Sequence, residues 1–108
     1  MIRYLNLSYN LMQDLSRRGF YGLETLETID MSFNDLREVD DRAFDNLKWL
    51  VNLKLNDNNI CSIKDSAFKG ASSLRELDLD NNRISRLYEE SFQGIKRSID
   101  QLGISGKF

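Results

Sequence analysis

The chain has 108 residues, of which 41% are hydrophobic and 30% charged, with a formal net charge of −2 and a pI near 5.1. This balance is that of a folded chain of one domain at most, and it gives no electrostatic case for nucleic-acid binding. The sequence has no histidine, a single cysteine (Cys61) and no apolar run near the ~20 residues of a membrane span, which excludes a cysteine zinc site, an internal disulfide and direct membrane insertion.

Four stretches of the chain, taken in order, repeat one pattern. They begin at Ile2, Leu26, Leu50 and Leu74 and read IRYLNLSYNLMQDL, LETIDMSFNDLREV, LVNLKLNDNNICSI and LRELDLDNNRISRL. Each continues to a phenylalanine, and these lie 24 residues apart, at Phe20, Phe44, Phe68 and Phe92. We predict a single repeat array over residues 1–108, with repeats 2–25, 26–49, 50–73 and 74–98 and a truncated fifth, 99–108, that holds only an opening strand.

Each repeat opens with two apolar residues separated by one other residue, which predicts a short strand with one buried face. Strands one repeat apart would then pair in parallel, about 4.8 Å from their neighbours. No single unit can bury its apolar face, so each needs the next. The pairs are Leu5 and Leu7, Ile29 and Met31, Leu53 and Leu55, and Leu77 and Leu79.

An asparagine follows each strand, at positions 10, 34, 58 and 82, and we expect its carboxamide to bond backbone groups where the chain leaves the sheet. The four phenylalanines would stack as a spine on the convex side. Gly22, Asn46, Gly70 and Gly94 follow them and tolerate positive φ. The remaining core positions would be Met12, Leu36, Ile60 and Ile84, then Leu15, Val39, Ile63 and Leu87.

The pattern L-x-x-L-x-L-x-x-N-x-L, followed by x-x-L-x-x-x-x-F-x-x-L, resembles the leucine-rich repeat family, and its late phenylalanine is similar to the typical 24-residue subclass. The resemblance covers essentially the whole chain. It implies an α/β repeat solenoid, a right-handed superhelix with a short-stranded parallel β-sheet on the concave face and loops or short helical turns on the convex face. Because the subclass occurs mostly in extracellular proteins, the resemblance implies a protein-recognition segment of a receptor or adhesion ectodomain. A free-standing intracellular scaffold or regulator in the cytoplasm is the alternative.

The fourth repeat carries the ligand spacing of an EF-hand calcium loop, with Asp78, Asp80 and Asn82 at alternate positions and Glu89 beyond them. The third repeat places Lys54 at the first ligand position, which is incompatible with a calcium loop. The spacing therefore belongs to the repeat, and we predict no metal site. A weak cation site between the two aspartates and neighbouring carboxylates is the alternative.

Catalysis has little support in the sequence. No histidine completes a nucleophilic set, and no Gly-rich phosphate cradle is present. The carboxylates lie along an open sheet face. We predict that the chain is no enzyme and needs no cofactor.

The outward strand positions of a solenoid form a continuous concave wall, which is the usual binding surface. Here the wall would carry seven carboxylates and three cations, with aromatic side chains toward the first repeat. Aromatic residues anchor interfaces and complementary charge steers encounter, so we expect a protein partner with a basic surface. In the alternative, two of the aromatic rings simply pack on each other. The expected partner-binding residues are Tyr4, Tyr9, Asp30, Phe33, Lys54, Asp57, Glu76, Asp78 and Asp80.

Three further residues stand out from the repeat pattern. Asn6 begins the glycosylation sequon Asn6-Leu7-Ser8, and a glycan there would cover part of the wall. Trp49, in the turn entering the third strand, is expected to cover neighbouring loops, with a rim contact as the alternative. Cys61 is expected to be a partly exposed spectator.

The two ends of the array lack the polar terminal repeats that arrays need. We therefore expect a fragment of a longer array, and association of the ends with a partner or a second copy is the alternative. The apolar edges would consist of Ile2, Leu5 and Leu7 at one end and Ile99, Leu102 and Ile104 at the other.

Overall fold

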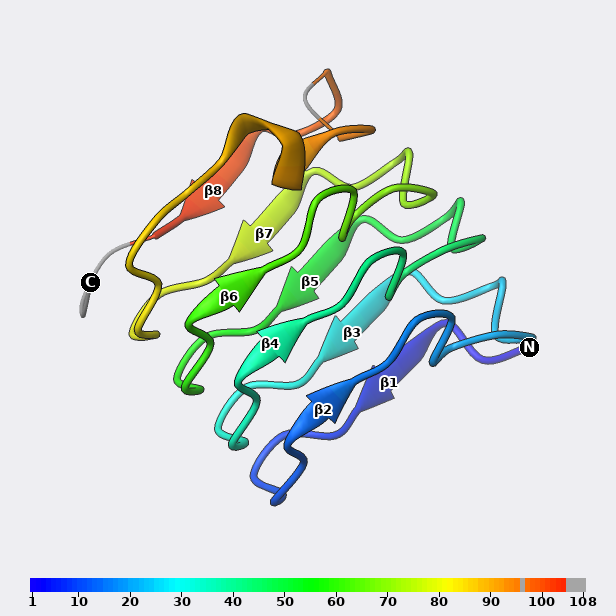
Figure 1. The fold of residues 1–108 in the computed structure, drawn as a ribbon. Helices are drawn as coiled ribbons and strands as arrows, with labels where there is room; N and C mark the ends of the chain where they lie inside the picture. The colour runs from blue at the N-terminus through cyan, green and yellow to red at the C-terminus, as the bar shows by residue number, and fades with distance from the viewer. Residues whose placement is uncertain (96, 105–108) are drawn as a thin grey trace.

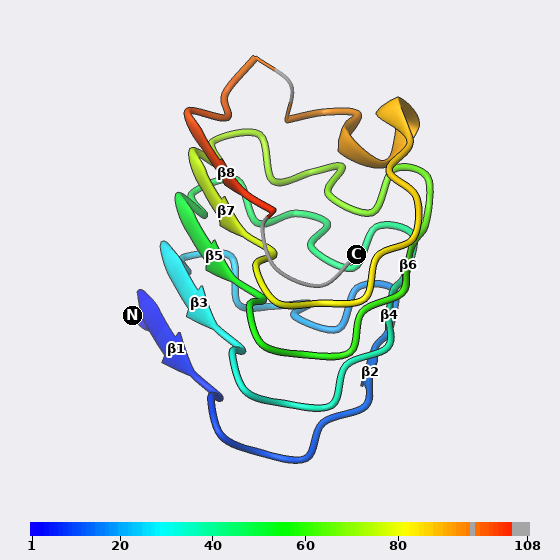
Figure 2. The same cartoon turned by 90° about the vertical axis from the view of Figure 1, so that its left-hand side faces the viewer.

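The computed structural model describes residues 1–95 and 97–104, which wind into a solenoid with two parallel β-sheets (Figure 1). Figure 2 shows the two sheets on opposite sides of the solenoid. The five-stranded sheet has the order β1 (Tyr4–Asn6), β3 (Thr28–Asp30), β5 (Asn52–Lys54), β7 (Glu76–Asp78) and β8 (Gln101–Gly103). The three-stranded sheet has the order β2 (Asp14–Leu15), β4 (Glu38–Val39) and β6 (Ser62–Ile63).

The register of the larger sheet follows the repeat period. Leu5, Ile29, Leu53 and Leu77 pair in sequence, each with the residue 24 positions further on, and Leu77 then pairs with Leu102. The fourth repeat, 74–98, is one residue longer than the others, and this inserted residue is accommodated before β8. This confirms the short parallel strands. The end of the predicted fifth unit, 105–108, lies outside the described residues.

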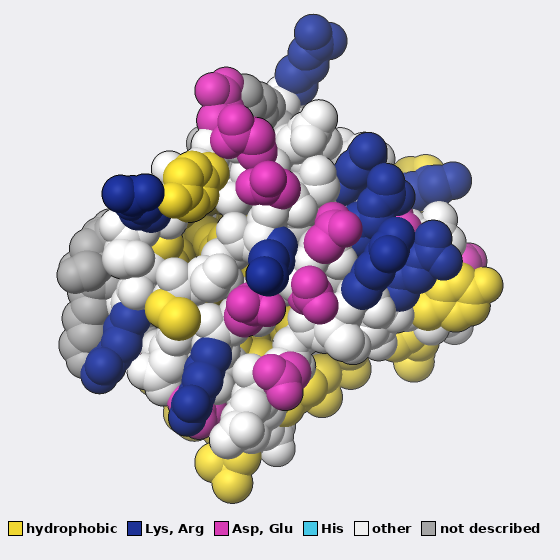
Figure 3. Space-filling model, in the orientation of Figure 1, with side chains coloured by type: hydrophobic (Ala, Val, Ile, Leu, Met, Phe, Trp, Pro, Cys, Tyr) yellow, Lys and Arg dark blue, Asp and Glu magenta, His cyan; other side chains and the backbone are white. Residues whose placement is uncertain are grey.

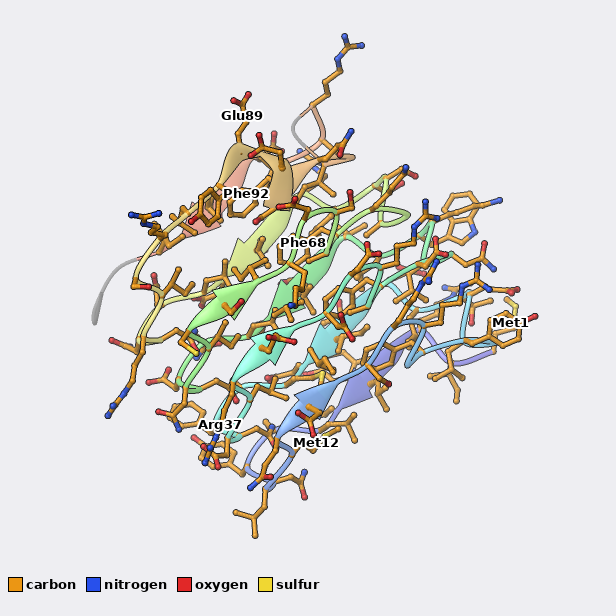
Figure 4. The ribbon with its side chains drawn as sticks, in the orientation of Figure 1. Met1, Met12, Arg37, Phe68, Glu89 and Phe92 are labelled. Carbon is orange, nitrogen blue, oxygen red and sulfur yellow. The ribbon has the colours of Figure 1, made fainter. Side chains whose placement is uncertain are left out.

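The core lies between the two sheets and is filled by equivalent apolar residues from successive repeats. The phenylalanine spine is as predicted: the rings of Phe20, Phe44, Phe68 and Phe92 stack with centroids 5.7, 5.8 and 5.9 Å apart and within 16° of parallel. Figure 4 labels two of them, Phe68 and Phe92. Offset stacking of this kind is favourable beyond the burial of the rings. Each repeat thus adds one ring to a stack that its neighbours complete.

The asparagines after the strands join consecutive repeats. Nδ2 of the buried Asn58 donates to the carbonyls of Met31, one repeat back, and Leu55, both at 3.1 Å. Its Oδ1 accepts the backbone N–H of Leu36 at 3.1 Å. The asparagines of the second and fourth repeats make the equivalent bonds. The first-repeat residue, Asn10, bonds only carbonyls of its own repeat. The predicted role of these carboxamides is confirmed.

The turn after the phenylalanine adopts positive φ in every complete repeat, at Gly22, Asn46, Gly70 and Gly94. At Gly70 the packing also demands the absence of a side chain. An added Cβ would lie 2.6 Å from Oδ1 of Asp45 and 2.9 Å from a backbone nitrogen.

Two features of the convex side differ from the sequence expectation. Three of its segments are two-residue strands that pair into a sheet of their own, where we expected loops or short helical turns. The fourth repeat forms no strand at the equivalent residues, 86–87, and the 3-10 helix η1 (Glu89–Phe92) that follows is a short helical turn of the expected kind. Leu87, predicted to be buried, is 39% exposed. The equivalent residues of the earlier repeats lie in strands of the second sheet and are buried, whereas Leu87 lies in no strand. They are Leu15, Val39 and Ile63.

The end strands leave apolar side chains in contact with solvent. Ile2 and Leu102 are exposed, while Leu5 and Leu7 are half-buried against the core. Hydrophobic side chains are visible along the edge that carries β1 and β2 (Figure 3). Among the described residues, no helix has the length and apolar character needed to cross a membrane.

Candidate functional site

The candidate site is the outward side of the five-stranded sheet, here called the sheet face. Its central column runs through Asn6, Asp30, Lys54 and Asp78, which pair in register. In three of the four, Oδ1 accepts the backbone N–H two residues on, at 2.9, 3.0 and 2.9 Å. These bonds hold the side chain along its own strand.

This local hydrogen bond explains the calcium-like spacing in the fourth repeat. Asp78 accepts the N–H of Asp80 just as Asn6 accepts that of Ser8, so alternate polar residues serve the turn. Within the part of the chain that the structure describes, no group of three or more metal-ligating side chains is placed to hold a metal ion.

A groove of about 580 Å³ lies on the sheet face over β5, β7 and β8. It brings together four of the predicted binding residues: Lys54, Glu76, Asp78 and Asp80. Asp100 and Gln101, which are not among the predicted binding residues, also line the groove, and Gln101 pairs with Glu76 in the sheet.

Close contact between carboxylates characterises the groove. Partial burial raises the pKa of Asp78; the N–H of Asp80 lowers it, and the charges of Asp80 and Asp57 raise it further. A raised folded-state pKa means that the stability contributed by this group is complete below its ordinary pKa and is lost as the pH rises through the raised pKa. Ionisation of Asp78 therefore opposes folding and favours any cation that approaches it.

Two cations of the sheet face are paired with its own carboxylates. Nε of Arg75 donates to Oδ2 of Asp100 at 2.8 Å, a contact that raises the pKa of Arg75. Nε of Arg3 lies 3.4 Å from Oε2 of Glu27. Among the described residues Lys54 is in no ion pair, and the face keeps an excess of carboxylates. Lys and Arg side chains gather on the opposite side of the molecule, which Figure 3 shows.

The turn that follows each strand of the larger sheet presents a second row of side chains. Tyr9, Phe33, Asp57 and Asn81 all have φ between 56° and 58°, and we call them the turn row. Each of the first three donates its N–H to a carbonyl of the next repeat at 2.9–3.2 Å. Asparagine and aspartate adopt this left-handed conformation readily, but tyrosine and phenylalanine do so rarely.

The two aromatic residues of the turn row stack on each other. Their ring centroids are 4.5 Å apart and the planes differ by 3°, so the rings do pack as the alternative reading held. Tyr9 is nevertheless 75% exposed and Phe33 43% exposed. The stack therefore remains available to a partner.

The other exposed aromatic residues lie apart from this stack. Tyr4, predicted with Tyr9 to bind the partner, begins β1 and forms no ring pair among the described residues. Trp49 is 66% exposed. It lines a second hollow, of about 330 Å³, together with Arg3 and Glu27 at the starts of the strands.

The remaining two singled-out residues are both exposed. Oδ1 of Asn6 accepts the N–H and the hydroxyl of Ser8 at 2.9 and 2.6 Å. Its Nδ2 donates no hydrogen bond within the described part of the chain. The thiol of Cys61 donates to the carbonyl of Arg37 at 3.4 Å.

Comparisons with known proteins agree with this geometry. The family model described as leucine rich repeat matches residues 2–60 and again residues 48–106. Among 18 matching solved chains is one from a crystal structure of a TLR13–ssRNA13 complex, with 29% identity and a TM-score of 0.87. The match covers 97% of this chain and 15% of that one, so the chain spans about 15% of its neighbour's length. No curated protein matches the chain.

Proposed function

The chain belongs to the leucine-rich repeat family, and from this premise we propose that it is a protein-recognition segment of a receptor or adhesion ectodomain, outside the cell or at its surface. Its sheet face would bind a protein partner with a basic surface. The binding set is that predicted from the sequence, with Asp100 and Gln101 added. It acts by contact alone, without catalysis or a cofactor.

The observation that carries the proposal is the groove on the sheet face. The repeats keep their buried positions nearly constant, yet the side chains that line the groove differ from one repeat to the next. A surface that varies on a constant scaffold is suited to recognition. The excess of carboxylates favours encounter with a basic partner.

RNA is the competing ligand class, because the solved neighbour is named as a complex with ssRNA13. Nucleic-acid binding draws most of its affinity from cations placed against phosphates. The sheet face offers Lys54 among clustered carboxylates, which would repel a phosphate backbone. We therefore favour a protein partner on this face.

A random dodecapeptide library displayed on phage tests the proposal. Peptides selected on the wild-type chain should lose about 10-fold or more in affinity for Glu76→Arg, which reverses a charge in the groove. The matched control, Glu38→Arg, reverses a charge on β4 in the other sheet and should leave binding unchanged. Equal loss in both variants, or none in the first, would refute binding on the sheet face.

The compartment can be tested through two residues. Exposed Asn6 supports an extracellular chain that carries a glycan, while the exposed free thiol of Cys61 favours the intracellular scaffold. Secretion from eukaryotic cells behind an added leader, with the mass measured before and after removal of N-linked glycans, separates them. Ser8→Ala should abolish the mass difference. Secreted protein without a glycan would end the proposal for Asn6.

Self-association through the end strands is a further part of the proposal. The exposed side chains of Ile2 and Leu102 support it. Sedimentation velocity over a wide concentration range should show a rising mean mass, and a constant monomer mass would exclude it.

A further inference from the structure

The turn row is aromatic in the first two repeats and polar in the next two. Tyr9 covers one face of the Phe33 ring, and the next position along the row is held by Asp57. Because an aspartate is much shorter than a phenylalanine, the row steps down there, and Asp57 cannot cover the second face of the Phe33 ring as Tyr9 covers the first. The 43% exposure of Phe33, despite its stacked neighbour, fits such a step.

The step combines two features that select one chemical group. An uncovered aromatic face attracts a planar cation that lies against it. The Asp57 carboxylate is in no ion pair among the described residues, and its Oδ2 accepts a hydrogen bond from Asn56 at 2.7 Å. A guanidinium group matches both features, because it is flat, stacks on rings and donates several N–H bonds to a carboxylate. The ammonium group of a lysine complements the carboxylate but is not flat and cannot stack on the ring.

Charge decides between an arginine and a nucleobase as the stacking group. Asp57 and Asp80 both raise the pKa of Asp78, so the Asp57 carboxylate that follows Phe33 in the turn row belongs to a group of three interacting carboxylates. A nucleobase would bring its phosphate into this negative field, whereas an arginine is drawn to it.

We infer that the step between Phe33 and Asp57 takes the guanidinium of an arginine presented by the protein partner. The inference rests on the proposed function and gives it a specific contact. The ring supplies the stacking surface, the carboxylate accepts the guanidinium N–H groups, and the acidic groove beside them attracts neighbouring positive residues. Phe33 and Asp57 thus act as a specificity pair at the end of the sheet face.

Short peptides titrated into the isotopically labelled chain and followed by NMR test the inference. The probes are acetyl-Gly-Ser-Arg-Ser-Gly-amide, the same peptide with lysine, and a single-stranded RNA dodecamer. The arginine peptide should shift the amide signals of Phe33 and Asp57 and bind about 5-fold more tightly than the lysine peptide. The informative variant is Phe33→Asn, which removes the ring and keeps the turn, because Asn81 holds the same conformation in the fourth repeat. It should weaken arginine binding about 5-fold and leave lysine binding unchanged. Glu38→Gln, on the other sheet, is the control.

Each outcome decides the inference. Equal binding of the two peptides, no effect of Phe33→Asn, or tighter binding of the RNA would overturn it. Library peptides that are sensitive to Glu76→Arg but not to Phe33→Asn would leave the proposed function standing and remove only the arginine contact. Peptides insensitive to both variants would remove the proposed function as well.

Discussion

Substitution of a single buried asparagine tests the mechanism that joins the repeats. In Asn58→Ala the buried N–H of Leu36 loses its acceptor, and no other is present within the described residues. An unsatisfied buried donor costs about 1–3 kcal/mol. The carbonyls of Met31 and Leu55 each lose one of two side-chain donors, for roughly 0.5–1 kcal/mol apiece. The sum is about 3 kcal/mol, a large part of the 5–15 kcal/mol that stabilises a typical domain.

Equilibrium urea unfolding followed by far-UV circular dichroism measures this loss, provided that the slope with denaturant stays unchanged. The control is Asn10→Ala, which removes an exposed carboxamide with bonds inside its own repeat only, and it should cost about 1 kcal/mol or less. Similar losses at the two positions, or a loss below about 1 kcal/mol for Asn58→Ala, would show that the bonds between repeats do not stabilise the array in this way.

Three further predictions use matched changes. Gly70→Ala should cost about 3 kcal/mol, because a methyl at φ +98° would lie 2.9 Å from a backbone nitrogen, whereas Gly22→Ala, with φ +89° and open space, should cost about 1 kcal/mol; equal losses in urea unfolding would contradict this. Asp78→Asn should stabilise the chain by an amount that grows as the pH rises from the ordinary value of 3.8 through the raised pKa of Asp78 and is constant above it, since the amide keeps the acceptor and removes the disfavoured charge. A thermal melt series against pH checks it, and a gap independent of pH would count against it. Leu87→Ala should change the unfolding free energy by less than about 1 kcal/mol and Ile63→Ala by about 2–3, and the reverse order would contradict the burial described.

The sequence predicted those parts of the fold that are formed by the same residue type in every repeat. The strands follow from alternate apolar residues such as Ile29 and Met31, the turn from its asparagine, and the spine from phenylalanines at constant spacing. Each of these features depends on one residue type that recurs at the same position of every repeat. The period therefore specifies the scaffold almost completely.

The parts that escaped prediction depend on neighbours in space. The two-residue strands of the second sheet need only a few backbone bonds, so no residue pattern marks them. Leu87 matches the repeat pattern, yet its segment departs from the strand path and becomes exposed. The pairing of Arg75 with Asp100 depends on how β8 aligns after an inserted residue.

For the candidate site, the sequence identified which side chains share the sheet face but not how they group. Lys54, Glu76, Asp78 and Asp80 line one groove. Tyr4 and Tyr9 lie apart, because Tyr4 begins β1 and Tyr9 lies in the turn after it. Ring stacking at 4.5 Å requires a turn conformation that aromatic residues rarely adopt. The sequence has no marker for the positive φ that sets Phe33 and Asp57 in one row.

The carboxamide bonds have a direction with a bearing on synthesis. Asn58 bonds backbone groups of the repeat made before it, and none of its side-chain bonds reaches the repeat made after it. As the chain leaves the ribosome, each turn therefore stays incomplete until the following repeat has emerged. Cotranslational folding of such an array would advance in steps of one repeat, always one unit behind the newest residue. A ribosome that stalls within a repeat would leave the previous one unfinished and open to proteolysis.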